Sequence, residues 1–468
     1  MDFLGIFLNK DSPLPLYSQL YHQLAGQIRT GTLPAGEKLP GKRPAAAALG
    51  VSVNTVDEAY QMLAAEGYVN AVPRSGFVIC RLEQSIPPPA TPPALGSAPP
   101  ATVPGAQGWL YSFSSGDLDE DLFPKKTWTR LLREVLTSQD GLFARGESMG
   151  DAVLHEAIAE YLRGYRGVQC QPEQIAVGAG LEVLTGMLAR LLEGRCFALE
   201  NPGYPKTAQI LANTGLHMAW VPVDGLGMQP EALAASGAQV AYITPSHQFP
   251  TGGVMPAPRR SELLRWAHAG QHFIIEDDYD SEFRFSGRPL PSMQGLDGAG
   301  RVVYAGTFSR SLAPGLRAAY LVLPQALLAR WRAAYSGYAC TVSRPEQHTL
   351  ACLMREGHFA RSLNRMRGVY RRRRDLLLVE LHRQFPAGRW HTQNEHTGLY
   401  FILRLPGQNA VQLAEQARGL RLHLRALAEY AVAPPAPQDT EALVLGYGGL
   451  AEQQIPEAVA ALRRVLFT

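Results

Sequence analysis

Cysteine, net charge and long apolar runs are all scarce in this chain, and each scarcity excludes a class of protein. The five cysteines among 468 residues are scattered and form no Cys-x-x-Cys pair, which disfavours a disulfide framework and a zinc site, so we expect no metal. No uninterrupted apolar run reaches the ~20 residues of a membrane helix, so we expect no membrane partner. The formal net charge of +3 is too small to indicate nucleic-acid binding by itself.

The length and the first residues bear on organisation and location. A chain of 468 residues exceeds what one hydrophobic core usually holds, so two or three domains are expected. Residues 1–10 lack a basic start, a sustained apolar core and a small-residue cleavage site, which predicts no secretory signal. With the odd number of scattered cysteines, this predicts a cytoplasmic protein.

A proline-rich segment divides the chain. Residues 85–108 contain many prolines and few apolar side chains, which predicts a semi-extended linker. The linker separates a small domain of residues 1–84 from a large domain of residues 109–468. Within the latter we expect a large part over about 109–325 and a small part over about 326–468.

The small domain has the pattern of a winged helix-turn-helix. Apolar residues recur at four-residue spacing from Leu16 to Ile28, which predicts a helix that Pro15 opens. Residues 43–49 predict a second helix, and Ser52 or Asn54 can cap a third that ends near Glu66. The segments 68–69 and 77–79 read as two strands joined by a hairpin wing.

The third predicted helix has the side chains that DNA recognition needs. A helix in the major groove meets base edges and phosphates with short polar or basic residues of its N-terminal turn, and a wing tip can reach a minor groove. The residues expected to contact double-stranded DNA are Lys42, Arg43, Ser52, Asn54, Thr55 and, at the wing tip, Arg74.

The overall charge of this domain favours an alternative. Residues 1–84 hold seven Lys/Arg and seven Asp/Glu, so there is no net attraction to phosphates, which supply much of the affinity for DNA. Asp57 and Glu58 lie early on the proposed recognition helix. A purely structural, solvated domain is therefore the alternative to a DNA-binding one, although Lys38, Lys42 and Arg43 can still form a local positive face with the wing.

The large domain alternates strand-like and helix-like segments. This alternation predicts an α/β fold with a mostly parallel sheet. After about residue 325 the pattern becomes helical and then that of a smaller α+β region. The segments expected as strands are 174–177, 196–199, 217–221, 240–244, 272–276 and 302–304.

Two long motifs resemble a known family. Residues 306–317 resemble the cofactor-lysine motif of fold-type I pyridoxal-phosphate (PLP) proteins, and residues 36–43 and 49–60 are similar to the GntR-type DNA-binding motif. Nearly the whole chain resembles the MocR/GabR-type regulators of the GntR superfamily. The resemblance implies a multi-domain fold: an N-terminal winged helix-turn-helix and an α/β fold-type I aminotransferase-like domain with a small C-terminal α+β subdomain.

The same resemblance implies a set of contacts to PLP. The glycine-rich turn 178–181 suits a phosphate, because a helix N-terminus binds anions. The family signature at 244–252 places His247 or Gln248 beside the cofactor ring. Asp277 is expected to pair with the pyridinium nitrogen, with Asp278 on the opposite side of an extended chain. The implied cofactor contacts are Ala179, Gly180, Leu181, Tyr204 (stacked on the ring), His247, Asp277, Tyr279 (on the ring hydroxyl), Thr307, Ser309, Arg310 and Arg317.

Arg310 departs from the family pattern. It stands where relatives carry the lysine that binds the cofactor covalently, and a guanidinium stays protonated and is a poor nucleophile. Val444 falls where aminotransferases carry the arginine for a substrate carboxylate, a contact for which Lys206 is a substitute. We therefore expect no catalytic residue in this domain and PLP binding, if any, to be non-covalent.

These observations support one main hypothesis and one alternative. The first is a DNA-binding transcription regulator whose aminotransferase-like domain dimerises and senses PLP or another small-molecule effector, without transaminase activity. The alternative is an active PLP-dependent aminotransferase with an accessory DNA-binding domain. The partners expected for the first are double-stranded DNA, the effector and a second copy of the chain.

Overall fold

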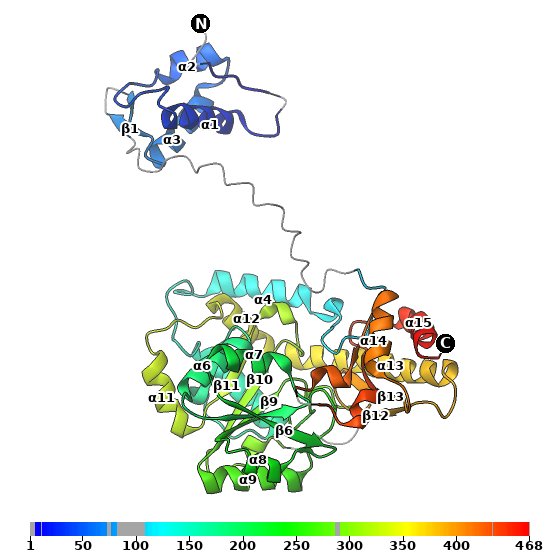
Figure 1. The fold of residues 1–468 in the computed structure, drawn as a ribbon. Helices are drawn as coiled ribbons and strands as arrows, with labels where there is room; N and C mark the ends of the chain where they lie inside the picture. The colour runs from blue at the N-terminus through cyan, green and yellow to red at the C-terminus, as the bar shows by residue number, and fades with distance from the viewer. Residues whose placement is uncertain are drawn as a thin grey trace. The chain divides into compact units, whose positions relative to one another are not determined.

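The chain divides into two compact units, residues 1–103 and 104–468 (Figure 1). The computed structural model describes residues 5–10, 12–72, 76–81, 108–285, 291–432 and 434–467. The linker predicted over 85–108 lies, apart from Gly108, outside these residues.

The N-terminal unit is a three-helix domain followed by a hairpin. Its hairpin is an antiparallel pair in which Val69 is opposite Ile79. The predicted winged helix-turn-helix is thus confirmed. The elements are α1 (Leu16–Arg29), α2 (Lys42–Leu49), α3 (Val53–Ala65), β1 (Val69–Val72) and β2 (Gly76–Ile79).

Local sequence explains the turn between α2 and α3. Gly50 ends α2 with a φ of 63°, a left-handed conformation that glycine adopts without strain. Ser52 then caps α3, because its side chain accepts a hydrogen bond from the N–H of Thr55 at 3.1 Å. Val56, Tyr60 and Leu63 of α3 are fully buried against α1, so the apolar stripe of α3 faces the core and its N-terminal turn faces solvent.

The C-terminal unit is built on an eight-stranded mixed sheet in the order β4-β11-β10-β9-β8-β5-β6-β7. Neighbours from β10 through β9, β8 and β5 to β6 are parallel, whereas β11 is antiparallel to both β10 and β4. The predicted fold class is confirmed. The strands are β4 (Ile175–Gly178), β5 (Phe197–Asn201), β6 (Met218–Asp224), β7 (Gly227–Met228), β8 (Val240–Ile243), β9 (Phe273–Asp278), β10 (Val302–Thr307) and β11 (Ala319–Val322).

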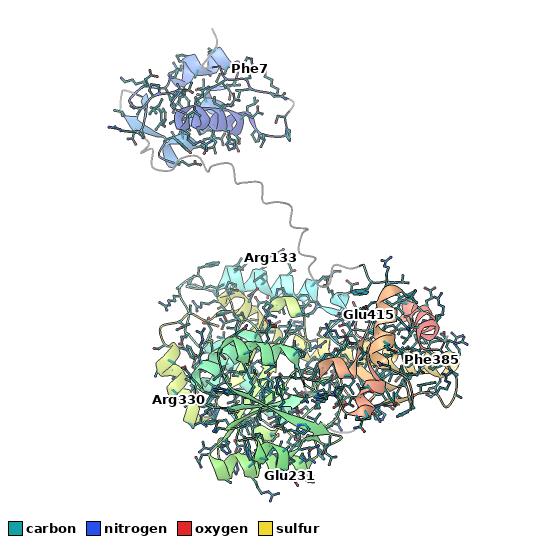
Figure 2. All side chains as sticks on the ribbon, viewed as in Figure 1. Phe7, Arg133, Glu231, Arg330, Phe385 and Glu415 are labelled. Atoms are coloured by element: carbon teal, nitrogen blue, oxygen red, sulfur yellow. The ribbon has the colours of Figure 1, made fainter. Side chains whose placement is uncertain are left out.

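Helices cover both faces of this sheet because its strands carry apolar residues on both sides. Phe197 and Leu199 of β5 pack in the cluster that contains α6, α7 and α11, whereas Ala198 between them packs with α8 and α9. Charged residues such as Arg133 and Glu231 lie at the outer surface (Figure 2). The helices are α4 (Lys125–Ser138), α5 (Ala152–Arg166), α6 (Leu181–Leu191), α7 (Pro205–Asn213), α8 (Pro230–Ala235), α9 (Ala257–Gly270), α10 (Met293–Leu296), α11 (Gln325–Tyr335) and α12 (Arg344–Arg355).

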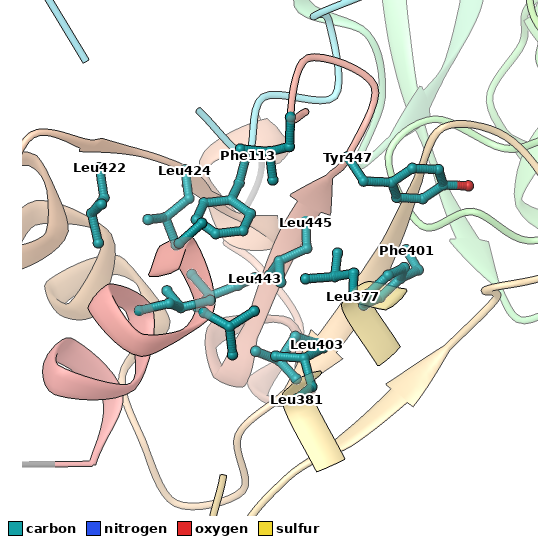
Figure 3. Packing of buried hydrophobic residues seen from close by; sticks show 14 of the residues in the cluster. Phe113, Leu377, Leu381, Phe401, Leu403, Leu422, Leu424, Leu443, Leu445 and Tyr447 are labelled. Carbon is teal, nitrogen blue, oxygen red and sulfur yellow. The ribbon is translucent and has the colours of Figure 1, made fainter. Parts of the chain in front are cut away.

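The last part of the chain forms a smaller α+β region around the antiparallel sheet β12-β13-β16-β15. Leu377 and Leu381 of the long helix pack beneath Phe401 and Leu445 of this sheet (Figure 3). Its elements are α13 (His358–Gln384), β12 (His391–Gln393), β13 (Tyr400–Arg404), α14 (Ala410–Gly419), β14 (Leu422–His423), β15 (Arg425–Ala426), β16 (Ala442–Gly446) and α15 (Ile455–Leu466).

The start of the C-terminal unit belongs to this smaller region rather than to the large part. β3 (Tyr111–Ser112) pairs with β14, and the fully buried Phe113 packs in the same core as Leu443 and Leu445 (Figure 3). The sequence predicts these residues in the large part, because a pairing over some 300 positions leaves no local signal.

No helix among the described ranges is long and apolar enough to cross a membrane.

Candidate functional site

A cavity of about 320 Å³ opens at the carboxyl edge of the large sheet, in the C-terminal unit. The ends of β9 and β10 and the N-termini of α6 and α7 surround it, which is where ligands bind in open α/β sheets. Nine of the eleven residues predicted to contact a cofactor line it: Gly180, Leu181, Tyr204, Asp277, Tyr279, Thr307, Ser309, Arg310 and Arg317.

One end of the cavity combines a helix N-terminus with an arginine. Gly180 precedes α6 with a φ of 93°, and a Cβ added there would lie 2.5 Å from Nη2 of Arg317. The positive φ favours glycine at this position, and the absence of a side chain leaves room for the guanidinium beside the first turn of the helix. Backbone N–H groups and the guanidinium together make this end suited to an anion.

A carboxylate of the chain already pairs with Arg317 and with a second cation, Lys206. Glu182, the second residue of α6, accepts from Nη2 of Arg317 at 2.9 Å and from Nζ of Lys206 at 3.0 Å. Lys206 and, less strongly, Arg317 lower the pKa of Glu182 below its usual value. Glu182 is not among the predicted residues, because an acid in a first helical turn is common and nothing in the local sequence indicates its two partners.

The other end of the cavity holds a buried carboxyl group. Asp277 is 6% exposed, and its Oδ2 accepts from the hydroxyl of Tyr242 at 2.6 Å. Its Oδ1 has no hydrogen-bond partner among the described residues. Burial raises the pKa of Asp277 from 3.8 to about 7, with the hydrogen bond from Tyr242 acting in the opposite direction.

Asp278 faces the opposite side of β9, as alternation along a strand requires. Its Oδ2 accepts from Nε of Arg166 at 2.7 Å and from the hydroxyl of Tyr304 at 2.5 Å. Both side chains of this ion pair are buried. Asp278 therefore serves the packing of the unit, and only its neighbour lines the cavity.

The predicted residues Ala179 and His247 do not line the cavity. The N–H of Ala179 donates to Oγ1 of Thr341 at 2.8 Å. His247 is buried behind Tyr279, with Nδ1 2.8 Å from Oδ2 of Asp280. Gln248 turns away as well, since its amide donates to the carbonyl of Pro202 at 3.1 Å. Of this segment, the cavity wall includes Thr244 and Phe249 instead.

Aromatic and hydroxyl side chains form the middle of the cavity. Tyr204 is half exposed and meets Phe249 edge to face at 5.3 Å between ring centroids. The hydroxyl of Tyr279 lies 3.0 Å from the carbonyl of His247, to which it donates. Thr307 and Ser309 are joined by a 3.0 Å hydrogen bond between their hydroxyls. A flat ring placed in this cavity would have an apolar wall beside it and polar groups at its rim.

Arg310 brings a further cation into the cavity. Its Nη1 is buried, and no hydrogen-bond partner for it exists in the described part of the chain. Val444 lies elsewhere, buried in an apolar cluster with Phe249, Tyr400 and Tyr430. Arg310 is thus a cation of this site whose buried Nη1 is available to a ligand.

The N-terminal unit presents a second candidate site at the start of α3. Asn54 is exposed there, and Arg43 is exposed at the start of α2. Ser52 and Thr55 are hydrogen-bonded to each other at 2.8 Å between their hydroxyl oxygens. The predicted contact Arg74 lies outside the described residues.

Asp57, one of the two acids on the proposed recognition helix, is paired with a lysine of the same surface. Nζ of Lys42 lies 2.5 Å from Oδ1 of Asp57, and this contact lowers the pKa of the carboxyl. Lys42 is therefore shared between a carboxylate and any phosphate, whereas no ion pair of Arg43 occurs within the described ranges.

Comparisons with known proteins agree with both units. Residues 16–79 match the family described as bacterial regulatory proteins, gntR family. The chain is 36% identical to the HTH-type transcriptional regulator YdeL of Bacillus subtilis (strain 168), over 98% of each chain. It is 34% identical to the probable rhizopine catabolism regulatory protein MocR of Rhizobium meliloti, over 98% of this chain and 95% of that protein.

Solved structures agree with the fold of the C-terminal unit. The α-aminoadipate aminotransferase LysN of Thermus thermophilus superposes with a TM-score of 0.68 at 27% identity, over 77% of this chain and 92% of that chain. An archaeal alanine:glyoxylate aminotransferase gives the same TM-score at 23% identity, over 76% and 90%. The likeness to this second enzyme concerns the fold alone.

Proposed function

This chain belongs to the family of helix-turn-helix transcriptional regulators that includes MocR, and we propose that its C-terminal unit senses PLP, or another small phosphorylated effector, by non-covalent binding. Arg310 carries this proposal, because we place it where an aminotransferase has its covalent anchor. A guanidinium is protonated at any physiological pH and cannot add to an aldehyde as a free amine does. The unit is on this view a sensor without transaminase activity.

The cavity has groups that fit PLP. The unpartnered oxygen of Asp277 is buried at one end, and a buried carboxyl without a cation suits the nitrogen of a pyridine ring. At the other end, Arg317 and the first turn of α6 suit a phosphate. When bound, PLP supplies an electron-accepting ring, and a donor set without metal suffices to hold it.

Each residue has a distinct task in this proposal. Asp277 holds a proton between its carboxyl and the ring nitrogen, and Tyr242 fixes the carboxyl orientation through its 2.6 Å hydrogen bond. Tyr204 covers a ring face, and Tyr279 orients the ring hydroxyl. Thr307, Ser309 and Arg317 bind phosphate oxygens. The cation of Arg310 attracts an aldehyde oxygen or a carboxylate by charge-assisted hydrogen bonds, and it forms no covalent bond with the ligand.

Visible absorbance and borohydride reduction test this proposal. We expect PLP to bind wild-type protein without a borohydride-stable adduct in the cavity, as judged by peptide mapping. Arg310→Lys should give a yellow protein whose adduct maps to residue 310, because a lysine there regains a reactive amine. Arg133→Lys, at the exposed surface, is the matched control and should give no adduct that maps to the cavity. A reducible adduct on cavity residues of the wild-type protein would restore the aminotransferase alternative.

The N-terminal unit supplies DNA binding in this proposal. Its GntR-type domain presents Ser52, Asn54 and Thr55 for the major groove, and Arg43 for a phosphate. Lys42 reaches a phosphate only in competition with Asp57. Arg74 remains a predicted wing contact. The absence of net charge over residues 1–84 means that affinity depends on the placement of these side chains.

A gel shift with the DNA upstream of its own transcription unit tests the contact list. The double variant Arg43→Ala, Thr55→Ala should bind at least tenfold more weakly, since a phosphate contact and a base-edge contact are each worth about 1 kcal/mol or more. Arg133→Ala removes one positive charge from the other unit and should leave binding unchanged. Equal binding by the double variant, with its circular dichroism preserved, would refute the list.

The proposal includes a cytoplasmic homodimer. The five cysteines are free, which suits a reducing compartment. A dimer would bring two recognition helices to two half-sites of an operator. Sedimentation equilibrium at micromolar concentration measures the assembly directly.

A further inference from the structure

The phosphate end of the cavity contains an anion that belongs to the chain itself. Glu182 Oε2 contacts Arg317 at 2.9 Å and Oε1 contacts Lys206 at 3.0 Å, so one carboxylate spans two cations. All three side chains line the cavity. Glu182 also lies in the first turn of α6, where the helix dipole favours a negative charge.

We propose that Glu182 determines which anions the cavity accepts: it competes with ligands for Arg317 and Lys206, and it thereby selects dianionic phosphate monoesters over carboxylates. This inference rests on the proposed function, since it concerns the same ligand site. A carboxylate ligand brings the same chemical group as Glu182. It gains no contact by the exchange, and the tethered group has the higher effective concentration.

A phosphate monoester differs from the Glu182 carboxylate in its charge and in its number of acceptor oxygens. It carries about −1.5 to −2 charges at pH 7 and three strong acceptor oxygens. It can therefore engage Arg317, Lys206 and the N–H groups of α6 together, which a carboxylate with two oxygens cannot. Since the Glu182 side chain is 44% exposed, it has room to turn into solvent when displaced.

The other charged residues that line the cavity, Asp277 and Arg310, make no contact with Glu182 within the described ranges. Asp277 has its hydrogen bond to Tyr242, and Arg310 makes no ion pair within the described part of the chain. Arg310 is thus available to carboxylates in any variant. A change in selectivity on altering Glu182 is therefore a change at the Arg317–Lys206 end.

The test compares Glu182→Gln with Glu193→Gln by isothermal titration calorimetry of the full chain. Glu193 is exposed and lies outside the cavity, so its change removes the same charge without touching the site. The probes are pyridoxine 5′-phosphate, which has no aldehyde to react with surface lysines, inorganic phosphate and acetate. Circular dichroism checks the fold of each variant.

We expect Glu182→Gln to bind pyridoxine 5′-phosphate about three- to tenfold more tightly, the range that exposed ion pairs allow. The ratio of affinities for inorganic phosphate and acetate should fall, because acetate no longer meets a competitor of its own kind. Glu193→Gln should match the wild-type protein.

Unchanged or weaker binding of all three probes by Glu182→Gln would overturn this inference. If the wild-type protein binds pyridoxine 5′-phosphate in that case, the proposed function still holds. If pyridoxine 5′-phosphate binds neither protein, the proposed function fails. In that case the ratio of affinities for inorganic phosphate and acetate still tests the role of Glu182. If Glu182→Gln binds neither anion, the proposed role of Glu182 is refuted.

Discussion

The two sides of β9 use neighbouring acids in opposite ways. On one side, Asp278 meets the guanidinium of Arg166 at 2.7 Å and the hydroxyl of Tyr304. On the other, Asp277 meets only the hydroxyl of Tyr242 and makes no ion pair within the described ranges. Each of the two acids leaves its Oδ1 without a hydrogen-bond partner among the described residues. The same residue type is thus a structural ion pair in one direction and a buried carboxyl without a cation in the other.

The difference shows where this fold accepts an energetic penalty. A buried carboxylate is tolerated when a cation and hydrogen bonds compensate for the lost hydration. Asp277 has no such cation, and burial raises its pKa to about 7. Groups with shifted pKa values in a cavity are candidates for ligand contacts, whereas compensated ones mostly serve stability.

The largest expected effect on stability comes from removing Arg166, the cation that pairs with Asp278. Arg166→Ala should lower the free energy of unfolding by about 3–5 kcal/mol, because Asp278 would be left buried without its partner. Chemical denaturation of the variant and of Arg163→Ala, an exposed arginine of the same helix, measures the difference. A loss below about 1 kcal/mol for Arg166→Ala, typical of surface pairs, would break the comparison.

An effect of opposite sign is expected on the cavity side. The folded-state pKa of Asp277 is about 7 against 3.8 in the unfolded chain, so the folded state binds the proton more tightly. The contribution of Asp277 to stability therefore falls as the pH rises from 3.8 to about 7 and is constant above. Asp277→Asn removes this loss and should be more stable than wild type at pH 8 by up to about 4 kcal/mol, with a difference that shrinks toward pH 4.

Unfolding curves from pH 4 to 8 measure this gain, and Asp278→Asn is the matched control. The control should be less stable than wild type at every pH in this range, because it leaves Arg166 without its carboxylate. If both asparagine variants shift stability in the same direction, the contrast between the two sides of β9 does not hold. Asp277→Asn should also weaken the binding of PLP.

Local rules predicted much of this molecule. The three helices of the N-terminal unit follow from apolar spacing and from caps such as Gly50 and Ser52. Six segments named as strands in the large domain correspond to β4, β5, β6, β8, β9 and β10. Strand alternation is equally local, and it places Asp277 and Asp278 on opposite sides of β9.

Contacts between distant segments escaped prediction. β11 pairs with β4, which lies far from it in the sequence, and β3 joins β14. The Glu182–Lys206 and Lys42–Asp57 pairs depend on how two elements approach each other. His247 lies in a motif but behind the cavity wall, because its ring contacts Asp280 and Tyr279 instead. A motif locates a segment, whereas the packing around it decides which side chain emerges.

The turn before α6 constrains position 180 through its backbone. Gly180 has a φ of 93°, a conformation that residues with a side chain rarely adopt, so a substitution there is strained whatever the space around it. Its Cβ would also lie 2.5 Å from Nη2 of Arg317, which would have to shift. Loss of the arginine at 317 alone would therefore not free position 180 to change.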